Sequence, residues 1–165
     1  MSSHVWGRLG PGRYLLLALL VVVLDQWSKA WVLASLAPGD VRSYTSFFDL
    51  VLAFNRGAAF SLLADQTGWQ HALFVALAIA VSLLIVRLLA RHRQEALFCT
   101  GLGLILGGAI GNLIDRLQIG AVVDFLSFHA GGWYWPAFNV TDSAITLGAA
   151  LVILDSLRQG RVRKG

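Results

Sequence analysis

The sequence predicts an all-α integral membrane protein, with four transmembrane helices and a small β-element in the loops outside the membrane. Of its 165 residues, 57% are hydrophobic and only 13% are charged, whereas a soluble domain is typically about 25% charged. Four apolar segments each come close to the roughly 20 residues that cross the hydrocarbon core of a bilayer. The basic residues gather at the borders of these segments, which argues against a nucleic-acid-binding surface.

We place the four spans at about 14–36, 69–86, 96–117 and 137–157. Pro38 follows the first span, and Pro136 precedes the fourth, where the missing N–H of a proline does little harm. A basic start and the residues Ser-Leu-Ala at 35–37 give the first span some features of a cleaved secretory signal. However, Asp25 and Lys29 interrupt its apolar centre one helical turn apart and can pair. We therefore interpret the first span as a retained helix that carries a structural polar pair.

The placement of lysine and arginine predicts the orientation of the chain. An even number of spans returns the chain to its starting side. That side carries nine basic residues: Arg8, Arg13, Arg87, Arg91, Arg93, Arg158, Arg161, Arg163 and Lys164. The other side carries Arg42 and Arg56, with Arg116 at its border. Both termini are therefore expected in the cytoplasm, and the loops at about 37–68 and 118–136 on the outer face.

The two outer loops carry extended-chain signals. The first contains FFDLVLAF at 47–54, rich in aromatic and β-branched residues, followed by the turn signal NRG at 55–57, which predicts a small hairpin or sheet. The second contains VVDFLSFHAGGWYWPAF at 122–138, with a turn expected at Gly131-Gly132. We expect this second stretch to be amphipathic or extended and to lie on the outer leaflet, where five of the six tryptophans also fall.

The third span combines small and polar residues. Glycines recur every four residues from Gly103 to Gly111, a spacing that allows close helix packing. Asn112 and Arg116 are also four apart, with Asp115 beside them. These residues form either an interfacial Asp–Arg pair that caps the span, or a site that donates hydrogen bonds to a peptide or an anionic head group. The spacing leaves both interpretations open.

Asp124 and Asp142 both fall at the outer mouth of the predicted bundle. Each has a simple interpretation: Asp142 as a carboxylate favoured at a helix N-terminus, and Asp124 as a solvated loop residue. Ionisable groups at membrane depth are costly, however, and usually mark a function. Eight polar residues map to this same outer half: Asp25, Lys29, Asn55, Asn112, Arg116, Asn139, Asp124 and Asp142. This shared depth predicts a site.

The residue types narrow the chemistry of that site. The only glutamate, Glu95, is expected on the cytoplasmic side, and the chain has no HExxH motif, so we expect no metal and no cofactor. A Ser–Lys dyad needs an uncharged lysine, whereas Asp25 lies one turn from Lys29. Two carboxylates at one depth favour an aspartic dyad, in which one member stays protonated and the other takes a proton from an attacking water.

A proton-coupled transporter is the alternative, because transporters also use intramembrane carboxylates. Such carboxylates lie near the bilayer midplane with access from both sides, and here only Asp25 is near the midplane, with Lys29 to neutralise it. A purely structural subunit would give no reason for so many polar residues in one layer.

Five motifs resemble those of the bacterial lipoprotein signal peptidases (signal peptidase II). They are DQWSK at 25–29, NRGAAF at 55–60, GGAIGNLIDR at 107–116, VVDF at 122–125 and FNVTDS at 138–143. The resemblance covers nearly the whole chain, and it implies a single membrane-embedded aspartic peptidase domain over residues 1–165, with a periplasmic β-cradle. It further implies removal of the signal peptide from diacylglyceryl-modified prolipoproteins, just before the lipidated cysteine, at the outer face of the bacterial inner membrane.

The same resemblance assigns roles to individual residues. Asp124 and Asp142 match the catalytic pair, and Asp25 and Lys29 match the polar pair of the first helix. The positions expected to bind substrate are Asn55, Gly57, Asn112, Arg116 and Asn139. Thr141 is a departure, because the family usually has alanine there. The implied partners are a lipid-modified prolipoprotein, membrane lipids and the cyclic peptide inhibitor globomycin. We expect a monomer.

Overall fold

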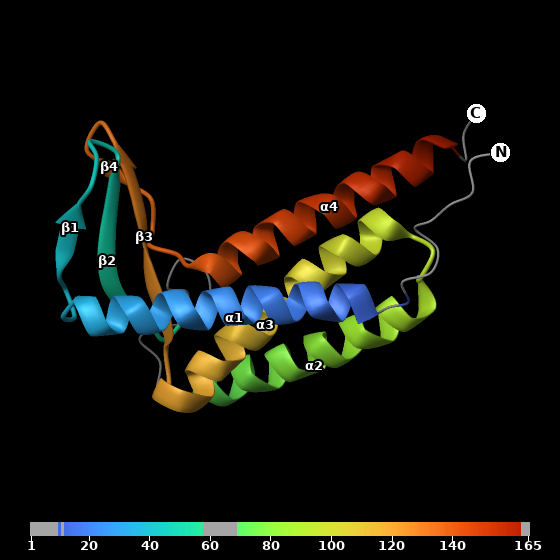
Figure 1. Cartoon of the computed structure of the whole chain (residues 1–165), viewed down its shortest axis with the longest axis horizontal. Helices are drawn as coiled ribbons and strands as arrows, with labels where there is room; N and C mark the ends of the chain where they lie inside the picture. The colour runs from blue at the N-terminus through green and yellow to red at the C-terminus, as the bar shows by residue number, and fades with distance from the viewer. Residues whose placement is uncertain (1–9, 11, 58–68, 163–165) are drawn as a thin grey trace.

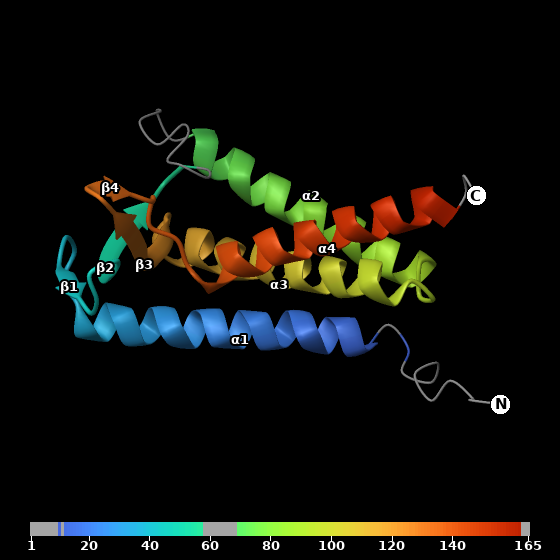
Figure 2. The ribbon, with the colours of Figure 1, turned by 90° about the horizontal axis from the view of Figure 1, so that it is seen from above.

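The computed structural model describes residues 10, 12–57 and 69–162. Four long helices form an elongated bundle with a small sheet at one end (Figure 1). The helices are α1 (Gly12–Ser35), α2 (Trp69–Arg91), α3 (Ala96–Ile119) and α4 (Val140–Val162). Each is long and apolar enough to cross a membrane, which confirms the predicted fold class. The start of α1 and the end of α4 both lie at the end of the bundle opposite the sheet (Figure 2).

The helix boundaries differ from those predicted by up to five residues, most of all in α2 and α4. The fourth helix begins at Val140 rather than at 137, because Phe138 still pairs with Leu126 of the sheet through two backbone hydrogen bonds of 2.8 and 3.0 Å. The second helix continues five residues past 86 to Arg91. Its last turns carry exposed Arg87 and Arg91, which can extend from an apolar helix to the membrane border.

α3 lies at the centre of the bundle and packs against the other three helices. A Cβ added at Gly103 would lie 2.9 Å from the carbonyl oxygen of Tyr14, and one at Gly107 would lie 2.7 Å from that of Ala18. Only glycine therefore fits where α3 touches α1, as the four-residue spacing predicted. This close approach brings the polar residues of the two helices within contact distance of each other.

Both outer loops contribute to one antiparallel sheet with the strand order β1-β2-β3-β4. The strands are β1 (Val41–Ser43), β2 (Phe48–Asn55), β3 (Val122–Ala130) and β4 (Trp133–Tyr134). The predicted turn joins β3 to β4 at Gly131 and Gly132, whose φ values of 58° and 83° suit glycine. The second loop is thus extended. Residues after Gly57 in the NRGAAF motif lie outside the described part of the chain.

The register between β2 and β3 places polar residues of the two loops side by side. Ala53 pairs with Asp124 and Asn55 with Val122, after a bulge in β2 between Leu50 and Ala53. Apolar residues of the sheet pack on the end of α1 in one cluster: Val32, Leu36, Leu50, Leu52, Val123 and Phe125. This packing holds the sheet against the helix bundle next to the polar layer.

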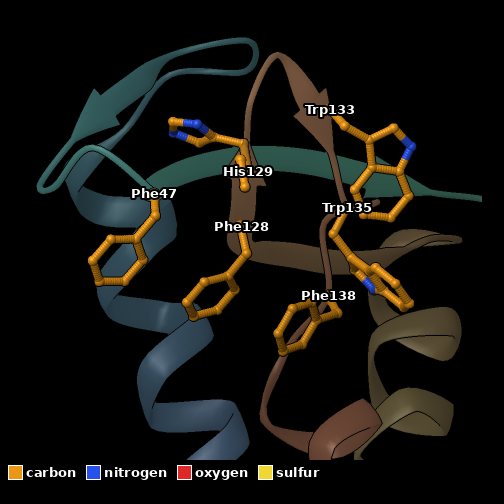
Figure 3. A pocket seen from close by; sticks show the side chains of 7 residues that line it. Phe47, Phe128, His129, Trp133, Trp135 and Phe138 are labelled. Atoms are coloured by element: carbon orange, nitrogen blue, oxygen red, sulfur yellow. The ribbon is translucent and has the colours of Figure 1, made fainter.

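Aromatic side chains gather on the sheet. Five of them line an open apolar hollow of about 390 Å³ (Figure 3): Phe47, Phe128, Trp133, Trp135 and Phe138. Trp133 is 62% exposed and Trp135 45%. Tryptophan at such exposure, beside the ends of apolar helices, is typical of a membrane–water interface.

Candidate active site

Asp124 lies in β3 and is only 3% exposed. Asn55 of the neighbouring strand donates a side-chain N–H to its Oδ2 at 3.1 Å, and Asn139 donates to its Oδ1 at 2.8 Å. The sequence interpretation of Asp124 as a solvated loop residue is therefore wrong. A buried carboxylate with two amide donors is held in a defined orientation.

Asp142 lies in the first turn of α4 and takes part in a capping arrangement. The side-chain oxygen of Asn139 accepts the N–H of Asp142 at 2.9 Å, and Asp142 Oδ2 accepts the N–H of Asn139 at 3.3 Å. Such reciprocal bonds between the N-cap and N3 residues satisfy two free N–H groups at the start of a helix. Asp142 thus lies at a helix N-terminus, as the simpler interpretation of this residue predicted.

Asn139 connects the two aspartates, because its side chain binds Asp124 through Nδ2 and the backbone of Asp142 through Oδ1. Asn112 of α3 donates to Asp142 Oδ1 at 3.1 Å. The structure therefore brings Asn55, Asn112 and Asn139 around the two aspartates, as their shared depth predicted.

The electrostatics of Asp124 favour its protonated form. Burial raises the pKa of Asp124 to about 7, and the nearby charge of Asp142 acts in the same direction. Hydrogen bonds from Asn55 and Asn139 oppose this rise. Close like charges in a buried site do not both ionise readily, so near neutral pH Asp124 can hold a proton.

Arg116 lies in the last turn of α3 beside these amides. Its guanidinium donates to the carbonyl oxygens of Gly57, at 3.1 Å, and Asn112, at 3.2 Å, and lies 5.2 Å from the ring centre of Phe74. Gly57 in turn donates its N–H to Asn55 Oδ1 at 2.9 Å. Arg116 thus anchors Gly57, two residues after the end of β2.

The Asp115–Arg116 pair that the sequence left open is not what the structure shows. Asp115 binds Lys29 instead, with 2.7 Å between Oδ2 and Nζ. Lys29 also binds Asp25 at 2.7 Å, as its spacing predicted. Gln26 donates to Asp115 Oδ1 at 2.8 Å. These charged groups are buried, with Asp25 0%, Lys29 2% and Asp115 4% exposed.

Sequence reasoning missed Gln26 and did not identify Lys29 as the partner of Asp115. The signal for both was their position inside the polar motifs, Gln26 between Asp25 and Lys29 and Asp115 one turn after Asn112. Adjacency along one helix suggested Arg116 as the partner of Asp115, whereas the pairing runs between α1 and α3.

The model of the family described as signal peptidase (SPase) II matches residues 17–158. The chain belongs to this family. It is 52% identical over 161 residues to a lipoprotein signal peptidase of Paraburkholderia phymatum, covering 98% of this chain and 96% of that protein. It is 54% identical over 160 residues to a lipoprotein signal peptidase of Ralstonia nicotianae, covering 97% of this chain and 92% of that one.

Solved structures of bacterial membrane enzymes share the fold. One, determined by the in meso method at 2.3 Å, has a TM-score of 0.82 and 29% identity, with 90% of each chain covered. A second, at 1.9 Å, has a TM-score of 0.79 at the same identity, covering 88% of this chain and 93% of that one. A member of the signal peptidase II family with four spans is a multi-pass inner-membrane peptidase, so the transporter alternative has no support.

Thr141 is the position at which this signal peptidase II chain departs from the expected motif. Its hydroxyl lies 2.7 Å from Asn112 Oδ1 and 2.6 Å from Asn139 Oδ1, and the residue is fully buried. A hydroxyl has one proton to donate, so it can bind either amide oxygen. Thr141 therefore contacts Asn112 and Asn139, two of the three asparagines that hold the aspartates, and its hydroxyl is accommodated within the site.

Proposed function

We propose that this chain is an aspartic endopeptidase that removes the signal peptide from diacylglyceryl-modified prolipoproteins, just before the lipidated cysteine. Membership of the signal peptidase II family supports the peptidase activity, and relatives named lipoprotein signal peptidase support the substrate class. The observation that carries the aspartic mechanism is the double contact of Asn139, which binds the buried Asp124 and the start of the helix that bears Asp142.

In the proposed mechanism, the two carboxyl groups act on one water and one carbonyl. Ionised Asp142 takes a proton from the water as the water oxygen attacks the scissile carbonyl carbon. Protonated Asp124 donates its proton to the carbonyl oxygen, which would otherwise become an oxyanion. When the tetrahedral intermediate collapses, the C–N bond breaks, the leaving nitrogen takes the proton from Asp142, and Asp124 regains its own.

Five residues around the dyad are proposed to bind the substrate: Asn55, Gly57, Asn112, Arg116 and Asn139. Amide and guanidinium groups are suitable partners for the carbonyl and N–H groups of an extended peptide. All of them lie in one network with the aspartates, which supports a single domain, and we propose that this domain acts as a monomer. The exposed aromatic residues of the sheet support contact between the sheet and membrane lipids (Figure 3).

We propose that both termini are cytoplasmic and that the sheet and the dyad face the periplasm. A reporter fused after Gly165 should be active in the cytoplasm, and one inserted at the β3–β4 turn near Gly131 should be active in the periplasm. The reason is the nine basic residues on the side of the termini, since lysine and arginine near membrane spans are retained in the cytoplasm. A periplasmic C-terminus would contradict both the orientation and the proposed access of the substrate.

The substrate class can be tested with purified protein and two matched prolipoproteins, one carrying a diacylglyceryl-cysteine and one carrying the same cysteine unmodified. We expect the modified substrate to lose a mass equal to its signal peptide, and the unmodified one to be cleaved at least about tenfold more slowly, a difference of about 1.4 kcal/mol in transition-state stabilisation. Equal cleavage of both would show that the lipid is not recognised.

A further inference from the structure

The backbone N–H groups directly before the two aspartates are each bound by a buried carboxylate. The N–H of Val123 donates to Asp115 Oδ2 at 3.1 Å, and the N–H of Thr141 donates to Asp25 Oδ1 at 3.2 Å. Val123 and Thr141 each immediately precede one aspartate of the dyad. These two carboxylates therefore fix the backbone of β3 and of the start of α4 one residue before each aspartate, and so help to set where the two aspartates lie.

A single cation joins the two carboxylates. Lys29 Nζ lies 2.7 Å from Asp25 Oδ2 and 2.7 Å from Asp115 Oδ2. Gln26 makes a second, neutral link, donating to the same two side chains at 3.2 and 2.8 Å. Two buried carboxylates this close would repel each other without a cation between them. We call these four residues the Lys29 cluster.

The Lys29 cluster connects four elements of secondary structure. Lys29 and Asp25 belong to α1 and Asp115 to α3, while the two bound N–H groups belong to β3 and α4. In Figure 1, β3 and the start of α4 come together beside α1. Hydrogen bonds to charged groups in a buried site are stronger than neutral ones, so the cluster can hold β3 and α4 at a set separation.

We infer that Lys29 is a positioning residue: acting through Asp25 and Asp115, it sets the separation of the two aspartates of the dyad without contacting substrate. This inference rests on the proposed aspartic mechanism. It goes beyond a structural pair, because a cluster that only stabilised the bundle would leave the catalytic properties of each folded molecule unchanged.

Two variants test the inference in the prolipoprotein cleavage assay. Asp115→Asn keeps the shape of the side chain and removes the charge that binds Lys29. We expect its kcat per folded molecule to fall by roughly tenfold to a hundredfold with KM within about twofold of wild type, since a displacement on the order of 1 Å can cost about a hundredfold. Gln26→Leu removes only the neutral link, leaves no charge unpaired, and should show a smaller loss in kcat alone.

The width of the pH–rate profile gives a second readout. The two apparent pKa values of a coupled pair belong to the pair, and their gap reflects the interaction between its members. Asp124 is faced by the charged groups Asp142 and Lys29 and by the amides of Asn55 and Asn139, and Arg116 is near both aspartates. If Asp115→Asn only removed a nearby negative charge, the two apparent pKa values would shift together and the profile would keep its width. If the distance between the two aspartates increases, their interaction weakens and the two apparent pKa values move closer together. We expect narrowing in both variants.

The matched control is Leu89→Ala, which truncates a buried residue of α2 at the end of the bundle away from the sheet. It should lower the melting temperature while leaving kcat and the profile width of folded molecules unchanged. The inference is overturned if Asp115→Asn and Gln26→Leu behave like this control. If Asp115→Asn does not fold, Gln26→Leu decides alone. Asp124→Asn in the same assay keeps the two proposals separate, because its activity would contradict the aspartic mechanism itself.

Discussion

Asp124→Asn and Asp142→Asn should each reduce cleavage of a lipid-modified prolipoprotein by roughly 10²–10⁴-fold or more, the usual contribution of a positioned acid or base. An amide can neither take a proton from water nor give one to the carbonyl oxygen. The substitution barely changes volume, and each aspartate already has amide neighbours with which an asparagine can pair. Loss of activity should therefore come without loss of the fold, as measured by thermal unfolding in detergent.

The pH dependence of stability provides the control for Asp124→Asn. Because the pKa of Asp124 is raised from 3.8 to about 7, the folded protein binds this proton more tightly than the unfolded chain does. The contribution of Asp124 to stability is then fully present below about pH 4 and is lost as the pH rises through about 7. The amide of the Asp124→Asn variant cannot ionise, so this variant should lose less stability than wild type between about pH 5 and about pH 8. An equal loss in both proteins would show that Asp124 titrates normally.

Arg116→Ala should lower kcat/KM by about tenfold to a hundredfold, since a hydrogen bond to a charged group contributes about 1.5–3 kcal/mol. We propose that the guanidinium binds the backbone of the substrate next to Gly57, whose carbonyl it already contacts. The inhibitor globomycin, a cyclic peptide, should use the same contacts, so its affinity should fall by a similar factor.

Arg116→Lys is the matched variant for this prediction. It keeps the positive charge but cannot reproduce the planar fork that reaches Gly57 and Asn112 while lying over Phe74. Most of the loss seen with alanine should therefore remain. If cleavage were lost while the affinity for globomycin stayed intact, Arg116 would serve only to anchor Gly57.

The helical part of this fold could be predicted because its signals are local. The length and hydropathy of each segment reveal a span, and the spacing from Gly103 to Gly111 reveals a contact face of α3. The β-element was predicted as a small hairpin or sheet in the first outer loop and an amphipathic or extended stretch in the second, without the pairing between them. Its register, which sets Asn55 opposite Val122, joins two loops far apart in the sequence, and the hydrogen bonds that align them leave no local pattern.

The site shows the same division between local and distant information. Because burying ionisable groups is costly, we predicted that the polar residues form one layer, and the structure brings them together. It did not reveal which groups pair, because Asp115 lies beside Arg116 in sequence but contacts Lys29 on another helix. Likewise, the double role of Asn139, as helix cap and as ligand of Asp124, required the three-dimensional arrangement of β3 and α4.

The most direct measurement is the rate of cleavage of a lipid-modified prolipoprotein by folded Asp124→Asn, Asp142→Asn and the double variant, under single-turnover conditions. If the two carboxyl groups act as one unit, each single variant should lose nearly all activity and the double variant should be scarcely slower than either, because losses within such a unit are strongly non-additive. Turnover close to wild type from either single variant, or losses that multiply in the double variant, would contradict the aspartic dyad.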